Sequence, residues 1–175
     1  HIGDVSPPTN DQITTFYKEN KDQFVEPARA TFRHLLLRVD ANADENTWSA
    51  TMNRANKFWK EMEPKQISLE DLVSQHSEDE ETKGTGGLLE NIIAPQLPPA
   101  LRQAVFDGEI GRVGTPVRTV AGVHLVRPEQ REPERSLSID EVRDYIAKQL
   151  TQESKRQSFE KYANHLIETA HIEYP

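Results

Sequence analysis

Two histidines and one aspartate are the side chains of this sequence that could do chemistry. His34 and His124 each fall in a short segment of strand-forming residues, and Asp79 belongs to the acidic run Glu78–Glu81. Imidazole is a common metal ligand, but no other histidine or carboxylate has ligand spacing around either one, so we expect no metal site. On residue type alone, both are half-buried strand histidines with a polar neighbour, and the acidic run is a solvated loop.

The composition excludes several classes of function. With no cysteine among 175 residues, the chain has no thiolate nucleophile, disulfide or cysteine-ligated metal. Its formal net charge of −8 argues against nucleic acid and anionic membranes, which both reward clusters of lysine and arginine. No stretch reaches the roughly 20 apolar residues of a membrane span, and we expect any targeting segment to have been removed or to lie upstream. A protein partner is the best supported class.

The first histidine lies in the first predicted strand. Residues 31–39 alternate loosely between apolar and polar types, which places Phe32, His34 and Leu36 on one face. Upstream, Thr9 and the glutamine three residues later form a capping box that predicts a helix to about residue 22. The apolar residues of that helix share one side, so it should dock on another element.

The acidic run follows two predicted helices. Apolar residues spaced by three and four predict a helix over 44–63, ended by Pro64, and Ser68 caps a short helix to about residue 75. Residues 77–87 then form a polar loop that closes in glycines. After several prolines, a further short helix is expected to end at Gly108.

The second histidine lies in a predicted β-hairpin. Segments 116–119 and 123–126 flank a short gap with a turn glycine, and the charged segment 128–136 is expected to be a linker. From a capping box at Ser138, one helical pattern runs to Ala170. Its middle is polar, which indicates that it reaches beyond the core. This order of elements predicts an α+β fold, a small sheet with helices packed on it.

Three segments resemble, in order and spacing, the parvulin family of peptidyl-prolyl isomerases. They are the strand Phe32–Leu36, the loop from Ser77 to Gly87, and Thr115-Pro-Val117 followed by Gly122-Val-His-Leu-Val126. The resemblance implies a four-stranded antiparallel sheet wrapped by helices. It places an isomerase domain at 28–130, between an N-terminal helical segment at 1–27 and a long C-terminal helix at 131–175 that packs with it. These flanking helices resemble those of bacterial cell-envelope foldases.

The resemblance also assigns roles to individual residues. His34 and His124 match the family's two facing histidines, and Asp79 matches an aspartate or cysteine beside the rotating amide. Thr119 matches a polar strand residue that touches the histidine pair. The apolar cradle for the proline ring carries over to Leu89, Leu97 and Leu101, with Phe106 behind them. The barrier of about 20 kcal/mol comes from amide resonance, so the reaction needs neither metal nor covalent nucleophile, and no cofactor is expected.

The sequence departs from the family pattern beside the cradle. Where the family usually has Gly-Gly-Asp-Leu-Gly and then an aromatic residue, this chain reads Gly-Gly-Leu-Leu-Glu-Asn-Ile over residues 86–92. Leu101 replaces the phenylalanine that would stack on the proline ring, and Ala121 stands where some relatives have serine. A leucine can bury a proline but lacks a flat face, so we expect a looser pocket and a lower rate.

Three hypotheses follow. The first is a peptidyl-prolyl isomerase that assists folding of extracytoplasmic proteins and binds unfolded, proline-containing polypeptide in the bacterial periplasm or cell envelope. The second is a weakly active or inactive parvulin-like chaperone module, which would hold extended polypeptide on apolar surface. The third is an assembly protein whose C-terminal helix associates with another copy. Catalysis, stoichiometric suppression of aggregation and concentration-dependent mass would separate them.

Overall fold

The computed structural model describes residues 6–169, with side chains over 6–167, and divides into two compact units. One unit spans Pro27–Glu134, and the other joins His1–Glu26 to Arg135–Pro175. The isomerase domain expected from the sequence, at 28–130, begins one residue later and ends four residues earlier than the unit Pro27–Glu134. Among the described helices, none combines the length and the apolar character needed to cross a membrane.

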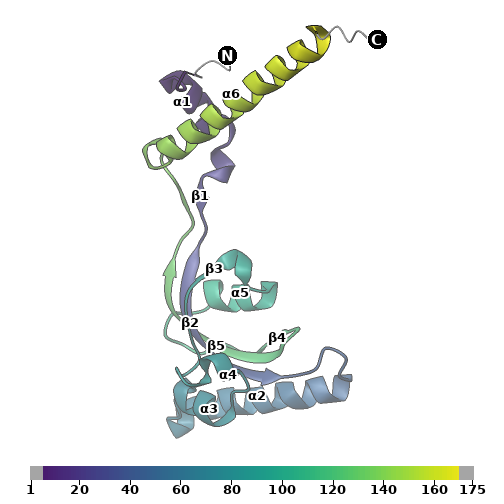
Figure 1. Cartoon of the computed structure of the whole chain (residues 1–175). Coiled ribbons are helices and arrows are strands. Elements are labelled where there is room, and N and C mark those ends of the chain that lie inside the picture. Colours follow the sequence, from purple (N-terminus) through teal and green to yellow (C-terminus); the bar gives the residue numbers. More distant parts are fainter. Residues whose placement is uncertain (1–5, 170–175) are drawn as a thin grey trace, which may run out of the picture. The chain divides into compact units, whose positions relative to one another are not determined.

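A four-stranded antiparallel sheet forms the centre of the unit Pro27–Glu134, which confirms the predicted fold class (Figure 1). From edge to edge the order is β3 (Leu88–Ile93), β2 (Arg29–Arg38), β5 (Gly122–Glu132) and β4 (Val117–Thr119). The two central strands pair along their full length, with one register irregularity between Thr31 and Phe32. They are also the strands that carry the two histidines.

Helices cover both faces of this sheet. Figure 1 shows α2 (Glu45–Lys65) and α3 (Leu69–His76) on one face and α5 (Pro99–Asp107) on the other. Two shorter pieces, α4 (Glu80–Lys83) and the 3-10 turn η2 (Ala94–Gln96), complete the unit. The caps follow the sequence: the Asp44 side chain accepts from the Thr47 backbone at the start of α2, and Ser68 and Asp71 form a capping box at α3.

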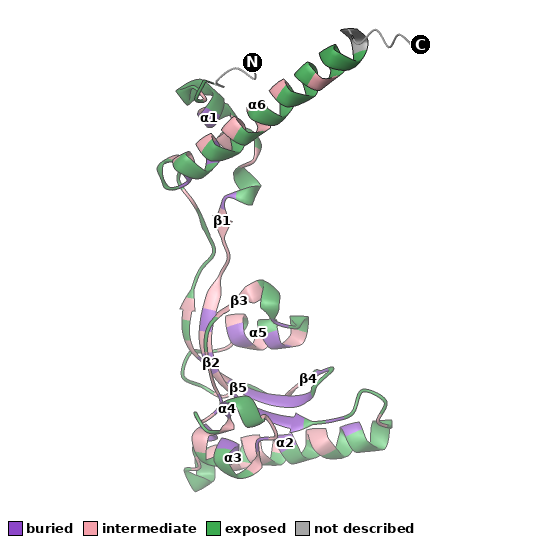
Figure 2. Ribbon diagram, in the orientation of Figure 1, coloured by how far each residue is buried: buried purple, intermediate pink, exposed green. Residues whose placement is uncertain are grey.

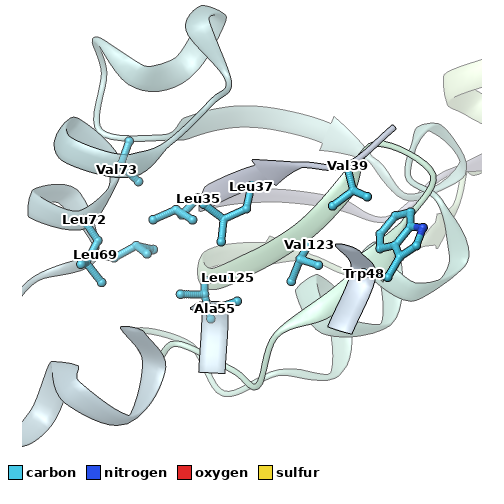
Figure 3. Packing of buried hydrophobic residues seen from close by; sticks show 10 residues of the cluster. All are labelled: Leu35, Leu37, Val39, Trp48, Ala55, Leu69, Leu72, Val73, Val123 and Leu125. Atoms are coloured by element: carbon cyan, nitrogen blue, oxygen red, sulfur yellow. The ribbon is translucent and has the colours of Figure 1, made fainter. Parts of the chain in front are cut away.

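The face under α2 and α3 is an apolar core (Figure 3). Successive strand residues point to opposite faces, so β2 and β5 send alternate side chains into it. Its buried members are Leu35, Leu37, Val39, Trp48, Ala55, Leu69, Leu72, Val73, Val123 and Leu125. None of these side chains is polar apart from the indole nitrogen of Trp48, so burial is the main contribution of this face to stability.

The face under α5 mixes apolar and polar side chains. Its apolar cluster contains Ala30, Phe32, Leu97, Leu101, Val105 and Val126. The next residues along the same face are His34 on β2 and His124 on β5, both buried. Phe32 contacts His34 edge-on, with ring centroids 6.3 Å apart. The predicted face with Phe32 and His34 is therefore confirmed, and it is the side of the sheet that holds polar chemistry.

The terminal unit pairs two helices. Its helices are α1 (Asn10–Glu19) and α6 (Ile139–Thr169). It also contains the 3-10 turn η1 (Lys21–Gln23) and two two-residue strands, β1 (Val25–Glu26) and β6 (Arg135–Ser136). Ile13, Phe24, Val142 and Ile146 form its buried cluster. The Thr9–Gln12 and Ser138–Glu141 capping boxes are both present. Beyond about residue 151, α6 is largely exposed (Figure 2). Its predicted end at Ala170 lies outside the described residues.

Two predicted element ends are wrong for local reasons. The helix predicted to end before Pro64 continues through it to Lys65, and Gln66 then leaves in a left-handed conformation with φ 52°. Proline has a helical φ and costs one hydrogen bond, which the last turn tolerates. The first helix ends at Glu19, earlier than residue 22, because the chain tightens into the 3-10 turn η1.

Three further segments differ because their partners are distant in sequence. Residues 128–132, expected in a linker, continue β5 against β2, and Pro128 stands at the register irregularity, where a missing N–H costs little. Residues 88–93, for which the pattern predicts no strand, form the edge strand β3. The polar loop 77–87 contains the single turn α4.

Candidate active site

His34 and His124 lie beside each other on the α5 face of the sheet. In the β2–β5 register His34 is opposite Val126 and His124 is opposite Leu36, so the histidines are diagonal neighbours across two adjacent strands. Their rings are stacked, with centroids 5.5 Å apart and an interplanar angle of 17°. The two Nδ1 atoms lie 3.2 Å apart, and the residues are only 5% and 4% exposed. This geometry makes the pair one hydrogen-bonded unit.

The segment after α3 brings Asp79 to this pair. β3 pairs only with the first part of β2, so the second part offers its edge to the loop. The Leu36 N–H donates to Ser77 Oγ at 3.3 Å, and the Glu78 N–H donates to the Leu36 carbonyl at 2.8 Å. The Asp79 side chain then reaches over the strand, with Oδ2 2.9 Å from His34 Nε2.

The far end of the loop is fixed on the same strand. The His34 N–H donates to the Gly87 carbonyl at 2.9 Å. Gly87 has φ +76°, and a Cβ there would lie 2.1 Å from the His34 carbonyl oxygen, so only glycine fits this close approach. The Arg33 guanidinium donates to the carbonyls of Thr85 and Gly86, at 2.6 and 3.1 Å. The loop is therefore held to β2 on both sides of Asp79.

Thr119 approaches His124 from the hairpin. Thr119 pairs with Gly122 across a two-residue turn of Val120 and Ala121, which confirms the predicted hairpin. The Ala121 N–H donates to Thr119 Oγ1 at 3.2 Å. That oxygen lies 2.8 Å from His124 Nε2. The four polar residues expected at the site thus form one continuous chain of hydrogen bonds.

The direction of each hydrogen bond in this chain follows from Asp79. An ionised carboxylate only accepts, so His34 must donate from Nε2, and its neutral ring then accepts at Nδ1. His124 therefore donates from Nδ1 and accepts at Nε2, where the Thr119 hydroxyl donates. Every donor meets an acceptor in this single arrangement. Asp79 thus fixes the tautomers of both rings.

The electrostatics keep both rings neutral. Burial lowers the pKa of His124 to about 4, and the neighbouring His34 adds to the effect. Burial also lowers the pKa of His34, against the opposing effect of the Asp79 carboxylate. For Asp79, burial raises the pKa, but hydrogen bonds from Thr82 and His34 outweigh it, so its pKa lies below the ordinary value. At neutral pH the site holds two neutral imidazoles and one anion.

Thr82 is a site residue that the sequence reasoning missed. Its hydroxyl donates to Asp79 Oδ2 at 2.6 Å and lies 3.2 Å from His34 Nε2, and the residue is only 7% exposed. It stands three residues after Asp79, one turn along the short helix α4. A hydroxyl residue at this spacing in the acidic loop was the available signal, and assigning the segment to a loop concealed it.

The four apolar candidates lie on the same face of the sheet but differ in exposure. Leu97 and Leu101 belong to the buried cluster under α5 and are 8% and 6% exposed, whereas Leu89 and Phe106 are partly buried at its margin. The structure therefore places Leu97 and Leu101 in the core and leaves Leu89 and Phe106 more open to a ligand. Among the described residues, no group of three or more histidine, aspartate and glutamate side chains could hold a metal ion.

Comparison with known proteins gives a family for this arrangement. Residues 8–144 match the model of the PPIC-type PPIase domain. The Campylobacter jejuni protein Cbf2 is 26% identical over 165 residues, covering 93% of this chain and 58% of that protein. Foldase protein PrsA of Caldanaerobacter subterraneus subsp. tengcongensis is 26% identical over 165 residues, covering 94% of this chain and 48% of its own length. The chain thus spans about half the length of these curated relatives.

A solved structure agrees over nearly the whole chain. It comes from work on the virulence factor PEB4 and the periplasmic protein Cj1289, described as two structurally related SurA-like chaperones of Campylobacter jejuni. It covers 96% of this chain and 64% of its own, with a TM-score of 0.72 and 26% identity. The fold and the order of its elements are therefore shared with proteins of this kind.

Proposed function

The chain belongs to the PPIC-type PPIase domain family, and on that premise we propose that its unit Pro27–Glu134 catalyses cis–trans isomerisation of the peptide bond before proline in unfolded polypeptide. The observation that carries this proposal is the chain of hydrogen bonds from Asp79 through His34 and His124 to Thr119. It holds one carboxylate rigidly beside two neutral rings on a buried face. Rotation about an amide requires this kind of fixed electrostatic environment and no proton transfer.

The carboxylate of Asp79 makes the site favour the twisted amide over the planar one. A planar amide carries partial negative charge on its oxygen because of resonance, and twisting the bond returns that charge to nitrogen. A fixed anion beside the carbonyl disfavours the planar form more than the twisted one, which lowers the barrier. The histidine pair and Thr119 position this anion, and they form the base of the pocket on which the amide would lie. Leu89 and Phe106 are the members of the proposed cradle that are open enough to contact the proline ring.

One observation favours a second function, a chaperone that binds polypeptide with little catalysis. Leu97 and Leu101 are nearly buried in the cluster under α5, so they offer little surface to a proline ring. The solved relatives PEB4 and Cj1289 are described as chaperones. Such a module would suppress aggregation only near equal stoichiometry, whereas an isomerase acts in catalytic amounts.

The test is the cis-to-trans rate of a proline peptide, read without a protease. We expect acceleration by the native chain and a loss of roughly tenfold or more in kcat/KM for Asp79→Asn, because the amide is isosteric but uncharged. Glu80→Gln is the matched control, since Glu80 is an exposed acid in the same loop. His124→Ala should also lower the rate. No acceleration by well-folded native chain would favour the chaperone.

We also propose that the clients are polypeptides folding outside the cytoplasm, in the periplasm or cell envelope. Support comes from relatives described as a foldase and as a periplasmic protein. Fractionation of cells that express the whole protein would test this location.

Association of two copies through the C-terminal helix stays a prediction. Phe159, Tyr162 and Leu166 are exposed on α6 at helical spacing. A mass that stays constant across a wide concentration range would contradict such association.

A further inference from the structure

A groove opens beside Thr119, next to the hydrogen-bonded chain. It is an open depression of about 470 Å³ between the start of α5, the hairpin turn, the loop after β2 and the start of α2. Thr119 belongs to both features: its hydroxyl bonds to His124, and the residue lines the groove. The apolar lining consists of Ala41, Trp48, Pro98, Pro99, Ala100 and Val120. The apolar depression therefore adjoins the hydrogen-bonded chain at Thr119.

The single charged group in the groove lining is already engaged. The Arg118 guanidinium lies 3.8 Å from the centroid of the Trp48 ring and 3.3 Å from the Glu45 carboxylate. Its stacking on an aromatic face and its acidic partner satisfy it without a ligand. An anionic side chain in the groove would compete with Glu45, whereas an apolar side chain would pack against the walls and leave this pair intact.

The turn residue Val120 is the most exposed large apolar side chain of the described residues. It is 82% exposed at the tip of the two-residue turn, and its backbone has no positive φ, so valine fits the turn without strain. A β-branched apolar side chain gains nothing there from packing within the chain. Contact with a ligand would bury it and give it a favourable free energy.

We propose that this groove binds an apolar side chain of the client, carried by a residue that flanks the isomerised proline. The inference rests on the proposed function, because the shared residue Thr119 makes the groove continuous with the amide site. It assigns a preference for large apolar residues over acidic ones at that flanking position. Val120 and the prolines at the start of α5 would form its two rims.

Peptide binding tests the groove independently of catalysis. The chain has two tryptophans, so Trp59→Phe leaves Trp48, which lies in the groove wall, as the only tryptophan reporter. Peptides with one central proline would carry leucine, alanine or glutamate immediately before or immediately after it. We expect the leucine peptide to bind about tenfold more tightly than the glutamate peptide at one of these positions.

Two matched variants decide whether the groove is responsible. Val120→Asp should bring the leucine and glutamate affinities close together, while Ile110→Asp, the same change at another exposed apolar residue outside the groove lining, should leave the preference intact. Equal affinities for leucine and glutamate at both positions, or a preference that survives in Val120→Asp, would overturn the proposal. Discriminating binding without any isomerisation would remove the proposed catalysis and keep the groove. Isomerisation without discrimination would do the reverse.

Discussion

The two faces of the sheet use the same strands for different purposes. On β2, Leu35 and Leu37 point into the apolar core under α2 and α3. Phe32 and His34, which alternate with them along the strand, point to the face of α5. On β5, Leu125 lies in the apolar core and its neighbour His124 in the polar chain. One face gains stability from burial that needs no specific geometry. The other face buries polar groups, each of which needs a hydrogen-bond partner.

This difference teaches where each kind of substitution should act. A side chain on the apolar face can be truncated without changing the geometry of the site, because alternating strand positions send the two sets of side chains to opposite faces. The polar face has more requirements, because its two histidines must be neutral, Asp79 must be ionised, and all of its polar residues must be hydrogen-bonded and correctly oriented. Four substitutions or conditions would break or sharpen this comparison.

Leu125→Ala should have the largest effect and should act on stability alone. Leu125 is fully buried between the strands and the helices of the apolar core, and its truncation is expected to lower the free energy of unfolding by about 3 kcal/mol. Urea unfolding measures this, with Ile110→Ala as the exposed control. The isomerisation rate per folded molecule should be unchanged. A lower rate in fully folded protein would show that the two faces are coupled.

Gly87→Ala tests how tightly the site loop is held to β2. The left-handed φ and the 2.1 Å approach to the His34 carbonyl predict a loss of about 2 to 3 kcal/mol in unfolding free energy. Gly84→Ala is the matched control in the same loop, because Gly84 has an ordinary right-handed conformation and a Cβ added there would meet no atom within 4 Å. Equal stability of the two variants would contradict the close approach.

Acid should weaken the polar face specifically. His124 has a pKa of about 4 in the folded chain and an ordinary value of 6.5 when exposed, so between these values the unfolded state binds more protons. The free energy of unfolding therefore falls as pH drops through this window, by about 1 kcal/mol per pH unit from His124. Urea titrations between about pH 5 and 7 measure the slope.

A His124→Gln variant provides the control for this titration. It removes the group that titrates, so its stability should depend less on pH, whereas Leu125→Ala should keep the native slope at lower stability. A slope that is the same with and without His124 would assign the pH dependence to other groups.

The elements that the sequence predicted well are those specified by nearby residues. The helices α2 and α6, and the caps at Thr9, Ser68 and Ser138, depend on spacing and side chains within a few residues. The strand β3 depends on pairing with β2, about sixty residues away, and its sequence does not alternate. Asn91 adds a positive φ of 54° inside it, which no local pattern announces. The continuation of β5 past Pro128 was missed for the same reason.

The sequence predicted which residues form the site better than it predicted the hydrogen bonds between them. Resemblance selected His34, Asp79, Thr119 and His124, and the structure brings them together, while their catalytic roles stay predictions. Sequence alone could not show that Asp79 fixes both tautomers, because the direction of each bond depends on which nitrogen faces which partner. Nor could it show the depth to which Leu101 is buried. That depends on how α5 packs on the sheet.

Thr82→Val is expected to have the smallest effect, and it asks whether the polar face depends on orientation as well as charge. Valine is nearly isosteric, so it removes the hydroxyl that donates to Asp79 and leaves the packing of α4 in place. We expect a loss of about 1 kcal/mol in unfolding free energy and a rate lower by a few fold. The pKa of Asp79, followed by NMR, should rise because one of the hydrogen bonds that lower it is gone. Thr82→Ser should restore both the pKa and the rate. If valine changes stability but neither of these, Thr82 supports only the fold, and the other partners of Asp79 are enough to position it.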